Sequence, residues 1–385
     1  MPDLVPELHE GGDAHVQAGR FEDALAAYRA AVALEPASAP LHYNIGNMLR
    51  LLRRFEEAIA SYGEAIALRP DFAMAHHNRA HCRLQIGALA EGFGEYEWRK
   101  ACPTFDDPRY ALPDQWAGQD LAGKTLFIYP ELFMGDLIQF CRYALMAERL
   151  GAKVRLGAPA AMHALLRTLS RGVELLPDDA SPEVDGYRCA LMSLPALFGT
   201  TLETVPWAPA YLRAEPARVE RWRSRIGEGG FKIGVAWQGS IQPHALPLQR
   251  SYPLAALDEI SRLPGVRLIS LQKQNGLDQL ANLPPGMAVE TLGEDFDPGP
   301  DLFLDTAAAM MGCDLFITPD TSVAHLAGAL GVPTWVALPW LADWRWLNDR
   351  RGSPWYPSLR LFRQQRRGEW GEVFAEMAAR LRALG

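Results

Sequence analysis

The sequence predicts a helical repeat region followed by two parallel α/β halves, and two observations lead to this prediction. Within the first hundred residues, positions that are 34 apart carry the same or similar residues. From Lys124 onward, short apolar runs alternate with helical patterns, which is the order that builds parallel sheets. With 385 residues, the chain is long enough for roughly two or three domains with substantial cores.

The composition is that of a globular protein. Hydrophobic residues make up 49% of the chain and charged residues 22%, and the net charge of −8 argues against general nucleic-acid binding. No segment is apolar for long enough to span a membrane, and the acidic first residues lack a signal-peptide core. The five cysteines are scattered, without zinc or disulfide spacing. We therefore expect a cytoplasmic protein.

The repeat occupies residues 1–100 in about three units. The matching pairs at the 34-residue offset are Phe21 with Phe55, Ala24 with Ala58, Tyr28 with Tyr62, Ala31 with Ala65, Leu34 with Leu68, and Pro36 with Pro70. A third unit keeps Asn78 and Tyr96. This period and its small and aromatic residues are typical of tetratricopeptide repeats, in which each unit is a helix–turn–helix. Such repeats form either a groove for a protein partner or a dimerisation surface, and the sequence does not choose between them.

Three histidines gather in the third unit. His77 and His81 are four residues apart on one helix face, with His76 beside them. No zinc-type spacing accompanies them. We expect solvated or groove-lining histidines.

Residues 101–120 read as an ordered linker rich in Pro, Asp and aromatic residues. An N-terminal Rossmann-like domain over 121–215 and a C-terminal one over 216–385 are predicted to follow. The expected strands are 124–129, 153–156, 173–176, 232–237, 266–271, 315–318 and 334–338, and the expected helices begin near residues 135, 160, 254, 301 and 324. Residues 204–216 read as a connection between the two halves.

The stretch from Asp314 to Pro339 is the centre of the second half. It reads as a strand, a turn at Pro319–Asp320, a helix with Thr321 and Ser322 at its cap, and another strand. Backbone N–H groups at the start of such a helix favour a phosphate, and His325 lies one turn further on. An ordinary strand–helix connection has the same pattern, and both interpretations remain open.

Other polar residues also follow the predicted strands. Since parallel strands direct their carboxyl ends to one edge, we expect a cleft there. The candidate donor-binding residues are Gln238, Arg250, Gln272, Lys273, Asp320, Thr321, Ser322 and His325. Arg250 and Lys273 can neutralise a diphosphate. Trp237, Trp340, Trp344 and Trp346 are either stacking platforms for a base or sugar, or ordinary buried side chains.

Asp136 follows the first strand and Gly135. A carboxylate in this position suits a general base, and it equally suits a helix cap. The pair Asp295 and Asp297 forms a DxD, a pattern that holds Mg²⁺ or Mn²⁺ in some nucleotide-sugar enzymes and also arises by chance. The chain has no GxGxxG after the first strand, which argues against a Rossmann dehydrogenase.

DTSVAHLAGALG, preceded by LQK and FLDTAA and followed by WRWL and SPWYP, resembles the bacterial tetratricopeptide-fused glycosyltransferases of GT-B fold. These are related to heptosyltransferase-like and flagellin-glycosyltransferase-like enzymes. The resemblance implies a GT-B pair of Rossmann-like domains, a nucleotide-sugar donor held by the C-terminal one, and no metal. It also implies that Gly135–Asp136 carries the base and that Asp320, Thr321, Ser322 and His325 bind the diphosphate. The chain departs from the family pattern at ELFM before Gly135, at Leu137, and at HALPLQ before Arg250.

The expected function is therefore an inverting, metal-independent glycosyltransferase without a further cofactor. Its acceptor would be a hydroxyl, on a flagellin-like protein docked by the repeats. Two alternatives are a non-catalytic repeat scaffold with a decayed transferase domain and a lipopolysaccharide heptosyltransferase. The chain is also a candidate homo-oligomer through its repeats.

Overall fold

The computed structural model describes residues 4–131, 133–206, 208–240 and 250–383, which form two compact units. The first unit comprises Met1–Ala111 together with two short later segments, Phe198–Thr204 and Asp343–Asn348. The second unit comprises Leu112–Leu197, Val205–Ala342 and Asp349–Gly385. Both α/β halves expected from the sequence thus lie in the second unit.

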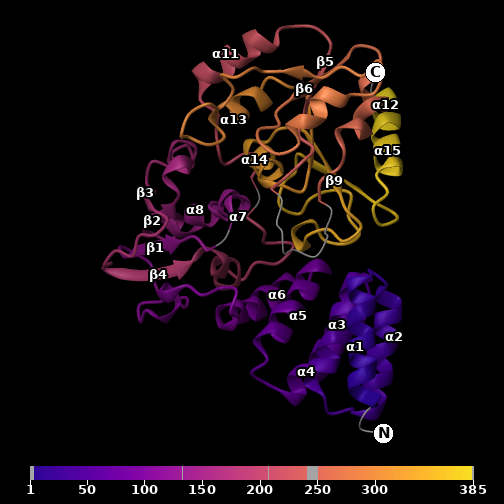
Figure 1. Cartoon of the computed structure of the whole chain (residues 1–385). Coiled ribbons are helices and arrows are strands. Elements are labelled where there is room, and N and C mark those ends of the chain that lie inside the picture. The colour runs from indigo at the N-terminus through magenta and orange to yellow at the C-terminus, as the bar shows by residue number, and fades with distance from the viewer. Residues whose placement is uncertain (1–3, 132, 207, 241–249, 384–385) are drawn as a thin grey trace. The chain divides into compact units, whose positions relative to one another are not determined.

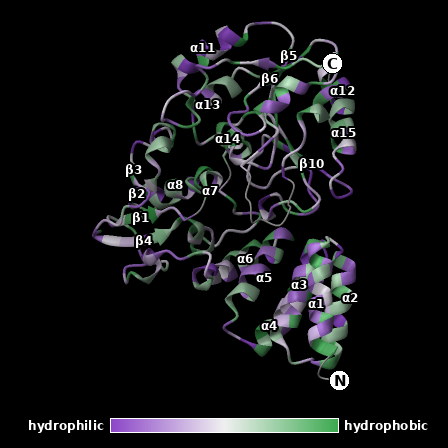
Figure 2. Cartoon of the chain, in the orientation of Figure 1, coloured by the Kyte–Doolittle hydropathy of each residue, from purple (hydrophilic) through white to green (hydrophobic). Residues whose placement is uncertain are grey.

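The first unit is a series of helix pairs (Figure 1). The helices are α1 (Leu4–Gln17), α2 (Phe21–Leu34), α3 (Ala39–Leu51), α4 (Phe55–Leu68), α5 (Ala73–Gln85) and α6 (Leu89–Tyr96). Hydrophobic and hydrophilic residues are interspersed along these helices (Figure 2), as amphipathic helices require. Two helices of the repeats stop two residues before a proline, α2 before Pro36 and α4 before Pro70.

Close packing inside each repeat follows the 34-residue period. A Cβ on Gly46 of α3 would lie 2.5 Å from Cε1 of Tyr62 on α4, and Gly12 has the same relationship to Tyr28 one repeat earlier. The tyrosine hydroxyls donate to equivalent positions, Tyr28 to Asp13 at 2.5 Å and Tyr62 to Asn47 at 2.8 Å. Glycine is therefore required where the paired helices approach.

Residues Asp343–Asn348 pack on the repeats, although they lie far along the chain. Their short helix η7 (Trp344–Trp346) places Trp344 edge-on to Phe93, with ring centroids 5.5 Å apart. Arg53 donates to the Asn348 side-chain oxygen at 2.5 Å. The repeat unit thus includes a segment that no repeat motif identifies.

The second unit contains two sheets whose paired strands are all parallel. The four-stranded sheet has the order β3-β2-β1-β4, from β1 (Thr125–Tyr129), β2 (Lys153–Ala158), β3 (Glu174–Pro177) and β4 (Gly186–Ala190). The six-stranded sheet has the order β10-β9-β8-β5-β6-β7, from β5 (Phe231–Val235), β6 (Val266–Ser270), β7 (Glu290–Thr291), β8 (Leu315–Pro319), β9 (Thr334–Leu338) and β10 (Leu359–Arg363).

Helices alternate with these strands, as the sequence predicts. They are α7 (Met134–Phe140), α8 (Arg142–Arg149), α9 (His163–Leu166), α10 (Leu194–Leu197), α11 (Pro216–Ile226), α12 (Asp258–Ser261), α13 (Leu304–Met310), α14 (Ser322–Leu330) and α15 (Gly371–Arg382). The sequence-based prediction omitted β4, β7, β10, α10, α11 and α15. Parallel sheets after helical repeats are confirmed.

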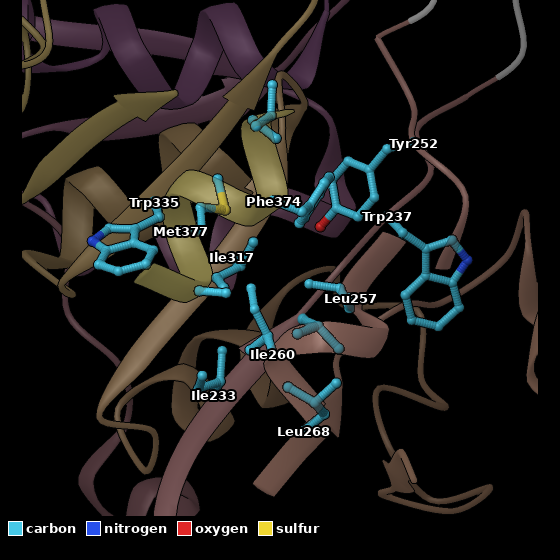
Figure 3. Close-up of a cluster of buried hydrophobic side chains, with 14 of the residues drawn as sticks. Ile233, Trp237, Tyr252, Leu257, Ile260, Leu268, Ile317, Trp335, Phe374 and Met377 are labelled. Atoms are coloured by element: carbon cyan, nitrogen blue, oxygen red, sulfur yellow. The ribbon is translucent and has the colours of Figure 1, made fainter. Parts of the chain in front are cut away.

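Apolar side chains bury one face of the six-stranded sheet (Figure 3). Ile233 of β5, Leu268 of β6 and Ile317 of β8 lie in the same cluster as Phe374 and Met377 of α15. Helix α15 therefore covers this face of the sheet. Its apolar residues recur at helical spacing because they pack on the strands. In the described residues, no helix is both long enough and apolar enough to cross a membrane.

Candidate functional site

The six-stranded sheet reverses its strand order between β5 and β8. The chain passes from β5 outward to β6 and β7, and then returns to the other side of β5 as β8. Such a switch point leaves a crevice beyond the carboxyl ends of the two strands. Gly239 after β5 and Thr321 after β8 meet there, since a Cβ on Gly239 would lie 2.8 Å from Thr321 Cγ2.

Helix α14 begins at this switch point. Thr321 is its N-cap residue in extended conformation, but its side chain makes no capping bond. The Thr321 hydroxyl oxygen is buried and has no hydrogen-bond partner within the described ranges. Ser322 is the first residue of α14 and is partly exposed, while Asp320 is buried. The hydroxyl and the first N–H groups of α14 are suited to an anionic ligand.

The Gln272 side chain ties the loops at the ends of β5 and β6 together. Its oxygen accepts from the N–H groups of Trp237 and Gln238, at 2.9 and 3.1 Å. Its amide nitrogen donates to the main-chain oxygens of Gln238 and Asn275, at 2.7 and 2.8 Å. The Gln238 side chain in turn accepts from Gln279 at 3.0 Å. Gln272 thus shapes the site wall through internal hydrogen bonds.

The two predicted cations lie in different settings. Lys273 Nζ donates to the main-chain oxygens of Phe296 and Asp297, at 2.5 and 3.1 Å, so it holds a neighbouring loop. Arg250 is exposed. The HALPLQ departure precedes it at residues 244–249, which lie outside the described residues.

Asp136 is the third residue of α7, whose N-cap residue is Phe133. Its carboxylate accepts the Phe133 N–H at 3.3 Å, while the Asp136 N–H donates to the Phe133 oxygen at 3.0 Å. The side chain is 8% exposed. The predicted N-cap role is wrong, because α7 begins at Met134 and its N-cap residue is Phe133; Asp136 instead accepts the N–H of that residue from within the first turn. The general-base role stays a prediction.

Gly135 brings the start of α7 against the start of α14. A Cβ on Gly135 would lie 3.1 Å from His325 Cδ2 and 3.6 Å from the Ser322 Cα. The absence of a side chain therefore allows a close approach between the two halves of the second unit. Asp136 is the next residue of α7 after Gly135.

His325 is buried one turn into α14. Its Nδ1 lies 3.0 Å from the hydroxyl of Tyr356, and its Nε2 would lie 3.8 Å from a Cβ on Gly135. Tyr356 was not among the predicted site residues. The SPWYP motif that contains it was noted only as part of a resemblance, and its contact with α14 depends on Gly328, where a Cβ would overlap the tyrosine ring.

The DxD residues have structural partners. Asp295 forms ion pairs with Arg221 and Arg225 of α11, and the hydrogen bond from Arg225 holds the pKa of this carboxyl below its usual value. Asp297 accepts from the N–H groups of Asp305 and Thr306 at the start of α13, at 2.6 and 3.0 Å. No cluster of three or more His, Cys, Asp or Glu suited to a metal occurs in the part of the chain described.

Three of the four candidate tryptophans are buried core residues. Trp237 is fully buried and donates from its ring nitrogen to the Gly276 oxygen at 3.0 Å. Trp344 and Trp346 are buried in the repeat unit. For these three the buried interpretation holds, because each fills a core. Trp340 is partly exposed.

The histidines of the third repeat are not solvated, which corrects one of the two expectations; that they line a groove stays a prediction. His76 stacks on Trp98 with ring centroids 4.0 Å apart and contacts Glu95 at 2.8 Å. Burial lowers the pKa of His77 to about 4 and that of His81 well below its usual value. Aromatic packing shields both ring nitrogens of His77 and Nε2 of His81 from water.

The fold defines a tetratricopeptide-repeat protein with a parallel-sheet unit. The tetratricopeptide repeat family matches residues 9–70 and 52–103, which confirms the predicted repeats. Protein FlbA of Caulobacter vibrioides is 28% identical over 330 residues, which cover 79% of this chain and 54% of FlbA. The chain therefore spans about half the length of this curated relative.

Solved tetratricopeptide structures are similar over about a quarter of the chain. The Yersinia enterocolitica type III secretion translocator chaperone SycD is 22% identical, covering 28% of this chain and 76% of SycD, with a TM-score of 0.26. The second tetratricopeptide domain of Spaghetti, bound to an HSP90 peptide, is 24% identical, covering 25% of this chain and 88% of that chain, with a TM-score of 0.24.

Proposed function

We propose that this protein is a glycosyltransferase that moves a sugar from a nucleotide diphosphate donor to an acceptor hydroxyl. The observation that supports the proposal is the approach of Gly135 to Ser322 and His325. Gly135 and Asp136 follow the first strand of the four-stranded sheet, and Ser322 and His325 belong to α14 at the switch point of the six-stranded sheet. The approach therefore brings the segment that carries the Asp136 carboxylate to a helix start whose N–H groups favour an anion. These are the two groups that an inverting transfer requires.

In the proposed mechanism, Asp136 takes the proton of the acceptor hydroxyl as that oxygen attacks the sugar. The nucleotide diphosphate leaves from the opposite face of the sugar. The start of α14 at Thr321 and Ser322 stabilises the departing negative charge. We propose a GT-B arrangement without a metal, in which helix N–H groups and Arg250 replace the cation.

The repeats are proposed to dock a protein acceptor. Tetratricopeptide repeats stack into an extended surface, and such surfaces bind peptides or other proteins. We also propose that the protein acts in the cytoplasm.

A screen of thermal unfolding with UDP, CDP, GDP and their sugar conjugates tests the donor site, because a ligand of the native state raises the unfolding temperature. We expect one diphosphate family to raise it and the Thr321→Ala/Ser322→Ala variant to lose the shift. No shift with any of these compounds would contradict the donor site.

A non-catalytic scaffold is the second candidate. Gln272, Lys273 and Asp136 all form hydrogen bonds with main-chain groups of the protein. These bonds favour a scaffold, because side chains that hold the fold together need no role in binding or catalysis. Turnover separates the two candidates: a protein that binds a sugar nucleotide but neither transfers nor hydrolyses its sugar, with any acceptor tested, is a scaffold.

A further inference from the structure

A buried arginine joins the two halves of the second unit. Arg142, at the start of α8, is 3% exposed. Its Nε donates to the Gln139 oxygen at 2.7 Å, and its Nη1 donates to the Trp355 oxygen at 2.8 Å. A buried guanidinium is costly unless its donors are satisfied, so this residue is fixed in place.

Two tyrosine rings enclose the guanidinium. Its Cζ lies 4.4 Å from the ring centroid of Tyr211 and 4.7 Å from that of Tyr356. Arg142 Nη2 donates to the Tyr211 hydroxyl at 2.8 Å, and that hydroxyl donates its own proton to the Ile138 oxygen at 2.8 Å. The Tyr211 hydroxyl is also a hydrogen-bonding neighbour of Tyr356.

Tyr356 connects this cluster to α14. It is fully buried, and burial raises the pKa of its hydroxyl to about 12, so it retains its proton at neutral pH. Arg142 is a hydrogen-bonding neighbour of Tyr356 and has donors only. The proton of Tyr356 therefore points away from Arg142. The Tyr356 hydroxyl lies 3.0 Å from His325 Nδ1, and the tautomer of the histidine decides which of the two groups donates.

We propose that Tyr356, held by Arg142, fixes His325 as the tautomer with its proton on Nε2. An Nδ1 that accepts a hydrogen bond carries no proton, so the neutral ring places its only N–H on Nε2. This nitrogen lies on the side of Gly135 and the start of α14. Tyr356 and Arg142 are then positioning residues, and His325 is the donor that they orient.

The identity of the group that accepts a hydrogen bond from the His325 Nε2–H rests on the proposed function. At the start of α14, that group is an oxygen of the leaving diphosphate. The proposed tautomer depends on contacts within the protein, so it can be measured without any ligand.

The test is a nitrogen–proton correlation spectrum of the full chain labelled with ring ¹⁵N-histidine. His325→Gln assigns the signal by its disappearance. We expect the Nε2–H pattern for His325 in the parent at neutral pH and a mixture of tautomers in Tyr356→Phe, which loses only the hydroxyl. A predominant Nδ1–H pattern in the parent, or no change in Tyr356→Phe, would overturn the proposal.

Tyr252→Phe is the matched control. It removes an equally buried hydroxyl, one that donates to the Ala236 oxygen and does not contact His325. It should leave the His325 signal unchanged. If Tyr356→Phe fails to fold, the parent spectrum alone decides the proposal, because the tautomer is its direct prediction.

Binding of inorganic pyrophosphate separates this inference from the proposed function. Tyr356→Phe should weaken pyrophosphate about fivefold, which corresponds to one ordinary hydrogen bond, while Tyr252→Phe should not. The Nε2–H tautomer in a protein that binds neither pyrophosphate nor any nucleoside diphosphate would support the positioning role and contradict the transferase.

Discussion

The side-chain amide of Gln85 donates a hydrogen bond of 2.8 Å to the main-chain oxygen of Leu347, which lies 262 residues later in the chain. Gln85 ends the third repeat's first helix, and Leu347 follows η7. The bond belongs to the repeat unit, together with the Arg53–Asn348 and Phe93–Trp344 contacts. The repeats are therefore completed by residues from the second half of the chain.

Because residues Asp343–Asn348 pack on the repeats, deletion of the repeats should expose apolar side chains in the rest of the chain. Deleting residues 1–100 leaves the strands and helices of the second unit intact but uncovers Trp344, Trp346 and Leu347. We expect the truncated protein to bind donor normally, to lose transfer to a protein acceptor, and to aggregate.

Light scattering and donor titration check these expectations. Adding Trp344→Ser and Trp346→Ser to the truncation should reduce aggregation, because the exposed apolar surface shrinks. Full-rate modification of a protein acceptor by a soluble truncation would show that the repeats do not dock it.

Thr321→Ala with Ser322→Ala should weaken binding of the nucleotide diphosphate without unfolding the protein. Each charge-assisted hydrogen bond lost should cost about 1.5–3 kcal/mol of binding free energy. Stability should hold because the Thr321 hydroxyl has no internal partner in the described residues. Calorimetry measures both quantities.

The matched control is Thr334→Ala in β9. Its hydroxyl donates to the Val332 oxygen at 2.9 Å in the core, away from the start of α14. This variant should lower the unfolding temperature and keep the affinity. Equal affinity in the parent and the double variant would remove the α14 start from the donor site.

Asp136→Asn should preserve the fold and donor affinity but lower turnover by about 10²–10⁴, the usual contribution of a general base. Asparagine retains the oxygen that accepts the Phe133 N–H, so the cap survives. It cannot take a proton from the acceptor at neutral pH. Steady-state rates at saturating donor measure the effect.

Asp320→Asn serves as the comparison, since this residue precedes the α14 cap. It should impair donor binding more than turnover. Parent-like turnover in Asp136→Asn alongside a defective Asp320→Asn would place the base elsewhere.

Activity should survive EDTA. Asp295 is engaged by two arginines and Asp297 by the first N–H groups of α13, so both carboxylates already have structural roles. Asp297→Ala should cost about 0.5–2 kcal/mol of stability through the lost cap. Denaturant unfolding measures this cost. Loss of activity in EDTA that Mn²⁺ restores would make the two aspartates metal ligands.

The repeat unit should lose stability in mild acid. The pKa of His77 is about 4 in the folded protein, against about 6.5 for a free histidine, because burial disfavours the charged ring. Between these values the unfolded chain binds a proton that the folded chain does not. Stability is therefore complete above pH 6.5 and falls as the pH drops towards 4.

His77→Phe tests this prediction, since phenylalanine can keep the ring contacts with Tyr96 and Phe105. The variant should unfold at a similar temperature at pH 7.5 and at a higher temperature than the parent at pH 5. The same loss of stability on acidification in both proteins would assign the effect to other groups.

Local patterns in the sequence determined the repeats and most strands. The 34-residue period survives because Gly12 with Tyr28 and Gly46 with Tyr62 are contacts within one helix pair, where sequence neighbours are also spatial neighbours. Likewise, the turn from β8 into α14 is visible in consecutive residues, because a buried strand and a helix start have distinct local compositions.

Only the tertiary structure decided the environment of residues whose partners lie far away in sequence. Neither the burial of His77 nor the packing of Trp344 on the repeats follows from a local pattern. The Arg142–Tyr356–His325 arrangement depends on three segments brought together by the two sheets. A local pattern records which face of an element is apolar, whereas long-range packing decides what that face meets.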